Sequence, residues 1–171
     1  MSIAYLGLGS NLGDRVGFIQ QAVSLLGGDE KIKVVSTSSF YETEPWRFKT
    51  ENWFVNAVII ISTSYYPEEL LNICLRIEQQ LGRNRSEESG YNDRNIDIDI
   101  LFYDDKIIDE HTGGIDLTIP HPLLHKRAFM LVPMLEVAPS YVHPVLKKSI
   151  SDIYDEIDDP ETVCLYGTRF V

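Results

Sequence analysis

The sequence has few cysteines, a deficit of basic residues and no long apolar run. Two cysteines among 171 residues are too few for a disulfide framework, which fits a reducing compartment. The 15 basic residues are outnumbered by 26 acidic ones, and this net charge of −11 argues against a broad nucleic-acid surface. No run of about 18 apolar residues or basic apolar leader occurs. We therefore expect a cytoplasmic protein that binds neither membrane nor nucleic acid.

The length and composition indicate one domain. A chain of 171 residues that is 44% hydrophobic is expected to bury about 70% of its unfolded surface. The sequence shows no repeat, linker or low-complexity tract, so the expected domain is the whole chain, residues 1–171. No strong interaction element is present, and we expect a monomer.

Hydrophobic periodicity predicts a strand–helix–strand–strand–helix–strand order. The expected strands are 2–8, 31–42, 52–63 and 94–103. The expected helices are 14–27 and 67–81. This order is that of the ferredoxin-like fold, an α+β class with helices on one face of a mainly antiparallel sheet. Beyond it we expect a helix over 124–136, broken or restarted near Pro133, and a solvated acidic helix and tail over 151–161.

The glycine-rich stretch "GLGSNLGD" follows the first expected strand. Gly7, Gly9 and Gly13 have the spacing G-x-G-x-x-x-G, which differs from the dinucleotide-binding fingerprint, and no G-K-[ST] of a P-loop follows. The stretch is therefore interpreted as a tight turn in which Ser10 and Asn11 bond nearby backbone groups.

Two aspartates interrupt the isoleucines of "NIDIDIL". Because side chains alternate along a strand, Asp97 and Asp99 share the face opposite the isoleucines, with Cα atoms about 6.6 Å apart. At a separation of ~5 Å and a dielectric constant of about 20, their repulsion amounts to roughly 3 kcal/mol. A Mg²⁺ ion would offset it, since this cation is held by one or two carboxylates plus substrate phosphates. The alternative is an ordinary solvated face of an edge strand.

Three arginines bracket this acidic pair. Arg83 and Arg85 follow the second expected helix, and Arg94 precedes the aspartates across a long polar loop at 83–93. A guanidinium group binds phosphate oxygens bidentately and stays charged, so a phosphate site is one interpretation. The other interpretation is that these cations stabilise the C-terminal end of the second helix and that the loop is solvated.

Aromatic and amide side chains suggest a site for a flat heterocycle. Phe54 and Asn56 share one face of an apolar strand, where a buried amide needs partners. A core asparagine bonded to backbone is equally compatible. Arg127 and Phe129 could add an anion contact and a second aromatic wall, whereas His121 could be a general base, a metal ligand or a turn residue.

Taken together, these motifs resemble one family, the 6-hydroxymethyl-7,8-dihydropterin pyrophosphokinases of folate biosynthesis. The resemblance runs over about residues 3–144 through an ordered series, which is more specific than any one motif: "YLGLGSN", "SSFYET", "WFVNA", "RIEQQLGRNR", "R-x-IDIDIL", "LTIPHPLLHKRAFML" and "P-x-LEVAP". It implies a ferredoxin-like enzyme that transfers pyrophosphate from ATP to the hydroxymethyl group of the dihydropterin and leaves AMP.

The resemblance also implies roles for individual residues. Asp97 and Asp99 match the ligands of two Mg²⁺ ions, and with Arg85 and Arg94 they form the expected catalytic set. The pterin contacts that it implies are the rings of Phe54 and Phe129, the side chains of Asn56 and Thr43, and the backbone near Trp46. The ATP contacts that it implies are Glu78, Arg83, Arg85, Arg94, Ile100, Thr118, His121 and Arg127, with Ile100 and Thr118 bordering the adenine or ribose.

Two other functions remain open for the sequence. A ferredoxin-like module could bind RNA or a small regulatory ligand without chemistry, although the net charge and the absence of an RNP-like aromatic pair disfavour RNA. An ordinary ATP-dependent kinase on the same scaffold would give ADP rather than AMP, so the nucleotide product distinguishes these functions.

Overall fold

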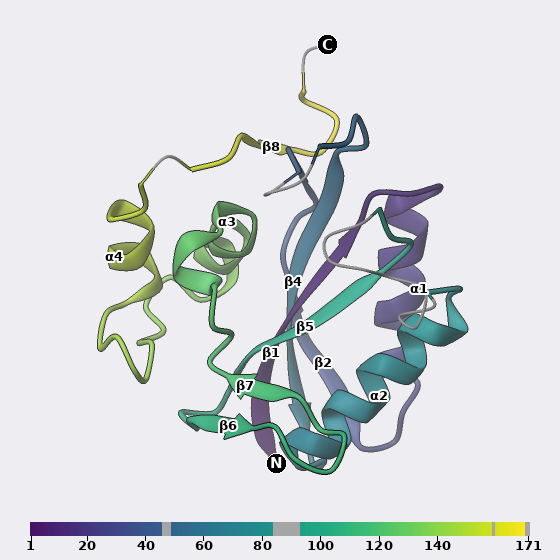
Figure 1. Cartoon of the computed structure of the whole chain (residues 1–171), viewed down its shortest axis with the longest axis vertical. Helices are drawn as coiled ribbons and strands as arrows, with labels where there is room; N and C mark the ends of the chain where they lie inside the picture. The colour runs from purple at the N-terminus through teal and green to yellow at the C-terminus, as the bar shows by residue number, and fades with distance from the viewer. Residues whose placement is uncertain (46–48, 84–92, 159, 170–171) are drawn as a thin grey trace.

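The computed structural model describes residues 1–45, 49–83, 93–158 and 160–169, and its centre is a six-stranded antiparallel sheet (Figure 1). The order along the sheet is β5-β1-β4-β3-β8, and β2 also pairs with β4. These strands are β1 (Ser2–Ser10), β2 (Ile32–Thr37), β3 (Tyr41–Thr43), β4 (Phe54–Thr63), β5 (Asp97–Tyr103) and β8 (Val163–Leu165). A separate hairpin consists of β6 (Ile108–Glu110) and β7 (Leu117–Ile119). The predicted α+β class and its ferredoxin-like strand order are confirmed.

Helices cover both faces of this sheet (Figure 1). One face packs against α1 (Arg15–Gly27) and α2 (Pro67–Gln80), and the other packs against α3 (Ala128–Val137) and α4 (Ile150–Asp155), with a 3-10 turn η2 (Leu124–Lys126) before α3. The two helices of the ferredoxin-like unit, α1 and α2, lie on one face as expected, and the elements that follow this unit in the chain, α3 and α4, cover the other face. The central strands are apolar on both faces, so the second face also needs a cover.

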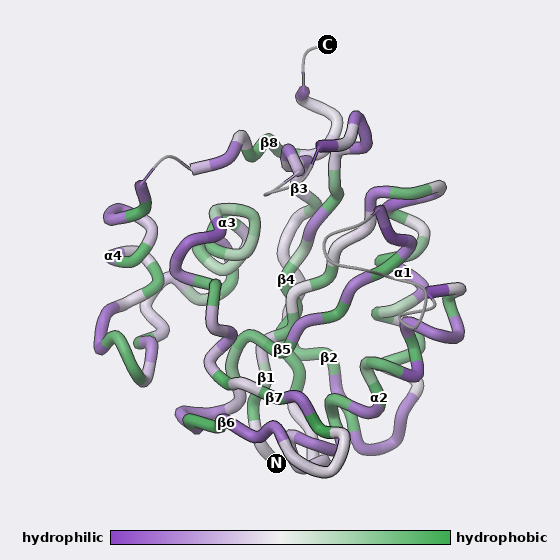
Figure 2. Tube along the Cα trace, viewed as in Figure 1, coloured by the Kyte–Doolittle hydropathy of each residue, from purple (hydrophilic) through white to green (hydrophobic). Residues whose placement is uncertain are grey.

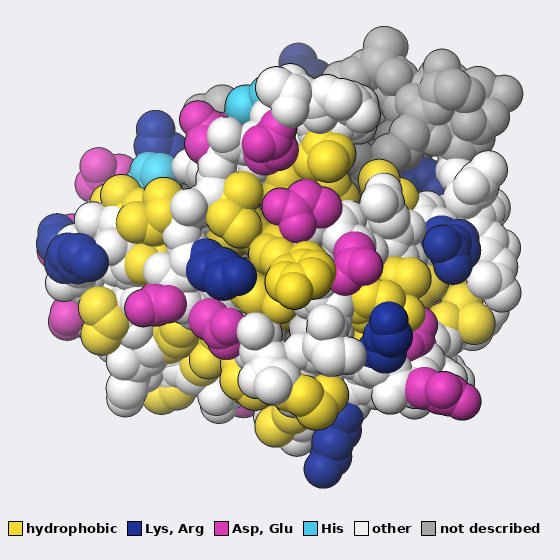
Figure 3. Space-filling model, turned by 90° about the horizontal axis from the view of Figure 1, so that it is seen from below, with side chains coloured by type: hydrophobic (Ala, Val, Ile, Leu, Met, Phe, Trp, Pro, Cys, Tyr) yellow, Lys and Arg dark blue, Asp and Glu magenta, His cyan; other side chains and the backbone are white. Residues whose placement is uncertain are grey.

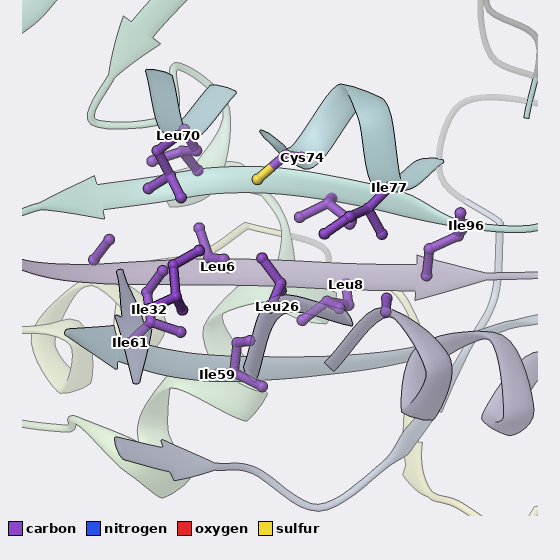
Figure 4. Packing of buried hydrophobic residues seen from close by; sticks show 14 of the residues in the cluster. Leu6, Leu8, Leu26, Ile32, Ile59, Ile61, Leu70, Cys74, Ile77 and Ile96 are labelled. Carbon is purple, nitrogen blue, oxygen red and sulfur yellow. The ribbon is translucent and has the colours of Figure 1, made fainter. Parts of the chain in front are cut away.

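The larger core lies between the sheet and the helices α1 and α2 (Figure 4). Leu6 and Leu8 of β1 meet Leu26 of α1 and Cys74 of α2 there. The strands at the centre of the trace are largely apolar (Figure 2). Both helices begin as the sequence predicts. Asp14 accepts a hydrogen bond from the backbone N–H of Gly17, and Pro67 occupies the first position of α2.

The second core lies under α3 and α4, where Val58 and Phe102 of the sheet contact Leu131 and Met134. Pro133 is inside α3 and does not break it, so the predicted break at this residue was wrong. A proline in a helix costs about 3 kcal/mol, and the burial of apolar side chains such as Leu131 and Met134, at ~1.5–3 kcal/mol each, offsets that cost. The interruption falls instead at Arg127, whose backbone is extended between η2 and α3.

The predicted strand 31–42 is two strands that pair with different parts of β4. Between them, the Ser38 backbone N–H donates to the Val58 carbonyl, and the Ser38 hydroxyl accepts from the Val58 N–H at 2.9 Å. The hydroxyl replaces a backbone acceptor at the break, so the buried N–H of Val58 keeps a hydrogen-bond partner.

The acidic C-terminal stretch contains the expected helix, but this stretch is more ordered than the solvated helix and tail that the sequence predicts. It contains α4, which buries Ile150 and Ile153, and β8, which pairs with β3. Glu161 accepts a hydrogen bond from the backbone N–H of Phe129 at the start of α3. The C-terminal segment therefore closes the sheet edge beside β3.

The surface shows no concentration of basic charge on the face drawn in Figure 3, where acidic, basic and apolar side chains are interspersed. Within the described residues, no helix has the length and apolar content that crossing a bilayer requires.

Candidate active site

The candidate site is a cleft of about 600 Å³, including its open mouth, on the sheet face that also carries α3. Strands β1, β4 and β5 form its floor, β3 one side, and the start of α3 the other. Its lining residues are Gly7, Leu8, Gly9, Thr43, Glu44, Phe54, Asn56, Ala57, Val58, Arg94, Asp97, Asp99, Arg127, Phe129 and Met130.

Strand register brings the acidic pair and the amide to the two sides of β1. Gly9 lies opposite Asn56 on β4 and opposite Asp97 on β5, and Gly7 lies opposite Asp99. Gly7 is within a strand as predicted, but the predicted turn at Gly9 was wrong, because β1 continues to Ser10. A Cβ on Gly9 would lie 2.6 Å from Asn56 Oδ1, so this position admits only glycine without displacing the amide.

The isoleucine and aspartate side chains alternate as predicted. Ile96, Ile98 and Ile100 are buried in the larger core, whereas the side chains of Asp97 and Asp99 are 22% and 27% exposed and face the cleft. The buried isoleucines hold the two carboxylates on the opposite face of the strand.

Two arginines balance the charge of Asp97. Arg83 Nη1 donates to Asp97 Oδ1 at 2.5 Å, and Arg94 Nη1 donates to Asp97 Oδ2 at 3.1 Å. The carboxylate pair therefore does not depend on a metal to offset its repulsion, because two guanidinium groups already lie against one member.

Arg83 is itself held from behind by a buried carboxylate. Glu78 is 1% exposed, and its Oε1 accepts from Arg83 Nη1 at 3.2 Å and from the backbone N–H of Ile98 at 2.7 Å. Glu78 thus connects α2 to β5 and fixes the arginine that contacts Asp97. Losing one partner of such a buried ion pair is costly, typically about 3–5 kcal/mol.

His121 lies on the other side of Asp99, with its Nε2 3.9 Å from Asp99 Oδ2. Burial and, next, the positive charge of Arg127 lower the pKa of His121 to about 4, so the ring is neutral at pH 7. Its Nδ1 accepts from the backbone N–H of Leu123, which puts the proton on Nε2, toward Asp99.

The opposite side of the cleft is aromatic and carries the amide. Phe54 and Phe129 both line it, with the Arg94 guanidinium 5.9 Å from the centre of the Phe54 ring and that of Arg127 5.5 Å from the Phe129 ring. Asn56 Nδ2 donates to the Thr43 hydroxyl at 2.6 Å. This bond fixes the amide, whose Oδ1 lies over the glycine floor.

The structure brings together most of the residues that the resemblance implies. Eight of them line the cleft: Thr43, Phe54, Asn56, Arg94, Asp97, Asp99, Arg127 and Phe129. Arg83 and His121 contact this group from the side. Trp46 and Arg85 lie outside the described residues.

Three predicted ATP contacts are placed elsewhere. Glu78 is behind the site, and the side chain of Ile100 is buried in the larger core, so neither side chain reaches the cleft. Thr118 lies on the β6–β7 hairpin, where its hydroxyl is 3.4 Å from Asp109 Oδ1. The proximity of Ile100 and Thr118 to the adenine or ribose stays a prediction, and for Ile100 the backbone of β5 is the part available for it.

Residues that the sequence reasoning missed include Gly7, Gly9, Glu44 and Met130 of the lining. Glycines inside an apolar strand signal a close approach of another group, and this signal was available for Gly9. Asn11 was assigned to local bonds, but its side chain bonds Asn52 and Asp93, which are 41 and 82 residues away in the chain.

The donor set fits Mg²⁺. Within the described part of the chain, no group of three histidine, cysteine or acidic side chains could hold a metal unaided. Asp97 and Asp99 are two oxygen donors at the mouth of a cleft with room for phosphates, which is the usual protein share of a magnesium site.

Comparisons with known proteins agree with this geometry. The family model for 7,8-dihydro-6-hydroxymethylpterin-pyrophosphokinase matches residues 5–139. A relative from Aquifex aeolicus named 2-amino-4-hydroxy-6-hydroxymethyldihydropteridine pyrophosphokinase is 38% identical over 156 residues, which is 91% of this chain and 92% of that protein. One of the same name from Methylorubrum extorquens is 42% identical over 142 residues, or 83% of this chain and 86% of that protein.

A solved structure of Plasmodium falciparum, titled HPPK-DHPS wild type with pteroate, superimposes with a TM-score of 0.72 at 20% identity. It covers 91% of this chain, whereas the chain spans only 42% of that longer protein, so the likeness shows the fold alone. The family match and the two relatives show more: the chain belongs to the 7,8-dihydro-6-hydroxymethylpterin-pyrophosphokinase family, and its activity is pyrophosphate transfer from ATP to hydroxymethyldihydropterin in folate biosynthesis.

Proposed function

We propose that the cleft on β1, β4 and β5 is where this transfer takes place, with Asp97 and Asp99 as the ligands of Mg²⁺. The observation that carries the proposal is the division of one cleft into two halves. Carboxylates and guanidinium groups gather over β5, and two phenylalanine rings and an amide gather over β4 and α3.

The aromatic half suits the pterin. Phe54 and Phe129 offer apolar faces to a flat ring, and such stacking contributes about 0.5–1.5 kcal/mol beyond the area buried. Asn56 Oδ1 can accept a hydrogen bond from the ring edge because the amide nitrogen is held by Thr43. A pterin here would place its hydroxymethyl group toward Asp97 and Asp99, across the width of β1.

The charged half suits the triphosphate. Arg94 and Arg127 line it and can bind phosphate oxygens, and we assign Arg85, in the segment between α2 and β5, to the same role. Arg83 is more buried and holds Asp97. Glu78 acts through Arg83, and Ile100 can contact a nucleotide only through its backbone on the edge strand β5. Thr118, on the neighbouring hairpin, remains a proposed nucleotide contact.

The chemistry follows from this arrangement. The hydroxymethyl oxygen attacks the β-phosphorus of ATP and loses its proton to solvent, the bond from this phosphorus to the α-phosphate oxygen breaks, and AMP leaves. Asp97 and Asp99 would hold Mg²⁺, which would supply positive charge beside the phosphates and favour loss of that proton. The protein aligns the two substrates, and Arg94 and Arg127 stabilise the negative charge that develops on the transferred group.

We also propose that residues 1–171 act as one domain and as a monomer in the cytoplasm. The acidic composition and the two cysteines support this view, and size-exclusion chromatography with light scattering tests the monomer directly.

The test of the site uses purified protein with Mg²⁺, ATP and 6-hydroxymethyl-7,8-dihydropterin. Chromatography of the nucleotides should show AMP formation by the native protein, and Asp99→Asn should lower kcat by at least ~100-fold. Asp99 is the sharper choice, because Asp97→Asn also disturbs the buried Arg83–Glu78 pair. Asp105→Asn removes an equal charge from the exposed turn after β5 and should leave kcat unchanged. A native rate in Asp99→Asn would refute the metal assignment, and ADP as the product would refute the transfer.

A further inference from the structure

Asp93 joins two loops that flank opposite halves of the cleft. Its Oδ1 accepts from Asn11 Nδ2 at 2.7 Å, and its Oδ2 accepts from Asn52 Nδ2 at 2.7 Å and from the Thr50 hydroxyl at 3.3 Å. Asn52 precedes β4, and Asp93 precedes β5. We call Asn11, Thr50, Asn52 and Asp93 the Asp93 junction.

Asn11 at the end of β1 is the buried centre of this junction. Its side-chain nitrogen also donates to the Asn52 carbonyl at 3.2 Å, and its Oδ1 accepts from the Arg94 backbone N–H at 2.7 Å. Its own backbone N–H donates to the Arg94 carbonyl at 3.1 Å. Asn11 is 3% exposed, and every donor and acceptor of its amide is engaged, so its orientation is fixed.

The junction sets the position of two site residues that it does not contain. Both backbone groups of Arg94 are held by Asn11, and the Arg94 side chain reaches Asp97 Oδ2. Asn52 is two residues before Phe54, whose ring lies 5.9 Å from the Arg94 guanidinium. None of the four junction residues lines the cleft.

We propose that Asp93 is a positioning residue for pyrophosphate transfer. It holds the segment before Phe54 and the backbone of Arg94 in one arrangement, and so sets the pterin half of the cleft relative to the phosphate half. The proposal rests on the function proposed for the cleft. Asp93 contacts neither substrate and acts through Arg94 and Phe54.

The need for a carboxylate follows from the donors around it. Asp93 receives N–H groups from two different amides on its two oxygens, and an asparagine has only one acceptor oxygen. Asp93→Asn therefore has the same shape but turns an NH₂ group against the NH₂ of Asn11 or Asn52. The exposed Asn52 amide can turn to accept from this NH₂ group, but the hydrogen bonds of residue 93 to Asn11 and Asn52 then lose their charged acceptor, and the Thr50 hydroxyl loses its acceptor.

A swap of the two side chains should restore the contact. In the double variant Asp93→Asn with Asn52→Asp, the new amide at 93 can accept from Asn11 and donate to the new carboxylate at 52. The hydrogen bond from Asn11 to the backbone carbonyl at 52 does not depend on that side chain. The net charge of the protein is the same as in the native chain.

The experiment measures kcat, the pterin KM and the emission of Trp46 and Trp53 in the native protein, Asp93→Asn and the double variant. We expect Asp93→Asn to lower kcat/KM for the pterin about 5- to 10-fold, the effect of exchanging charge-assisted hydrogen bonds for neutral ones. The tryptophan spectrum should shift, because both tryptophans flank the loop that Asn52 anchors. The double variant should recover most of both changes.

Two results would overturn the positioning role: native kinetics in Asp93→Asn, or a double variant no better than the single one. A lower melting temperature with native kinetics would show that Asp93 only stabilises the fold. Asp105→Asn is the matched control for removal of an acidic charge. Since native turnover is measured in the same assay, failure of the function proposed for the cleft is seen separately, as absent AMP formation by the native protein.

Discussion

A methyl group at Gly9 should displace the side-chain amide of Asn56 in the aromatic half of the cleft. The Cβ of Gly9→Ala would lie 2.6 Å from Asn56 Oδ1 and 3.7 Å from a ring carbon of Phe54. A separation of 2.6 Å is well inside carbon–oxygen contact, so the amide must move. Asn56 Nδ2 then loses its buried hydrogen bond to Thr43.

The size of the effect follows from that bond. A buried polar group left without its partner costs about 1–3 kcal/mol, so Gly9→Ala should lower the free energy of unfolding by that amount. The same displacement moves the amide of Asn56, which we propose bonds the edge of the pterin ring. We expect the pterin dissociation constant to rise about 5- to 150-fold, measured by calorimetry in the presence of a non-hydrolysable ATP analogue.

Gly7→Ala is the matched control, two residues earlier on the same face of β1. The atoms nearest to its Cβ would be those of the Leu101 side chain, at 3.4 Å or more, which is ordinary contact. Replacing a strand glycine by alanine without strain stabilises a protein by about 0.4–1 kcal/mol. If Gly9→Ala were as stable as Gly7→Ala and bound pterin normally, the argument that glycine is required for the approach of Asn56 would be refuted.

Two further predictions concern carboxylates outside the cleft. Burial raises the pKa of Glu136, but hydrogen bonds from Tyr41 and Ser39 outweigh this effect and leave the pKa below its usual value of 4.5. The ionised carboxylate therefore stabilises the folded state above pH 4.5, and this stabilisation is lost as the pH falls through the folded-state pKa. Urea unfolding between pH 3 and 7 should show this loss in the native protein and a flatter profile in Glu136→Gln, and equal profiles would contradict it. Glu161→Gln weakens the acceptor for the Phe129 N–H and should raise the pterin KM about 2- to 10-fold with kcat nearly unchanged. The control Glu156→Gln removes an exposed partner of Lys148 and should leave the pterin KM unchanged. A native KM in Glu161→Gln would count against this prediction.

The fold was predictable where burial follows a local period. The alternation of isoleucine with aspartate over 96–100 predicts which side chains face the core, and the structure agrees. The helices α1 and α2 have a capping aspartate and an initial proline that act within a few residues. Such signals need no knowledge of the rest of the chain.

The errors arose where distant contacts decide the structure. Gly9 has the local signature of a turn, but its partner Asn56 makes it a strand residue. β8 is three residues long, too short to show a period, and it forms because β3 offers an unpaired edge. Pro133 is tolerated because α3 is almost wholly apolar and packs between α4 and the sheet. The bonds of Asn11 reach across 41 to 83 residues, which no local pattern reveals.

Two guanidinium groups hold Asp97, the carboxylate that we propose as a ligand of Mg²⁺. Both of its oxygens face guanidinium groups, Arg83 on Oδ1 and Arg94 on Oδ2, so Mg²⁺ alone must compete with two cations for one carboxylate. A triphosphate supplies anionic oxygens that can take over Arg94 and bind the metal at the same time. The metal and the nucleotide should therefore bind cooperatively, with a coupling of about 5- to 150-fold.

Calorimetric titration with Mn²⁺ or Mg²⁺, with and without a non-hydrolysable ATP analogue, measures this coupling after correction for the metal affinity of the free nucleotide. Linkage requires the nucleotide affinity to rise by the same factor when metal is present. In Arg94→Gln, one competitor of the metal is gone, so the metal alone should bind more tightly and the coupling should shrink. Equal metal affinities with and without nucleotide in the native protein would show that the two arginines do not restrain Asp97.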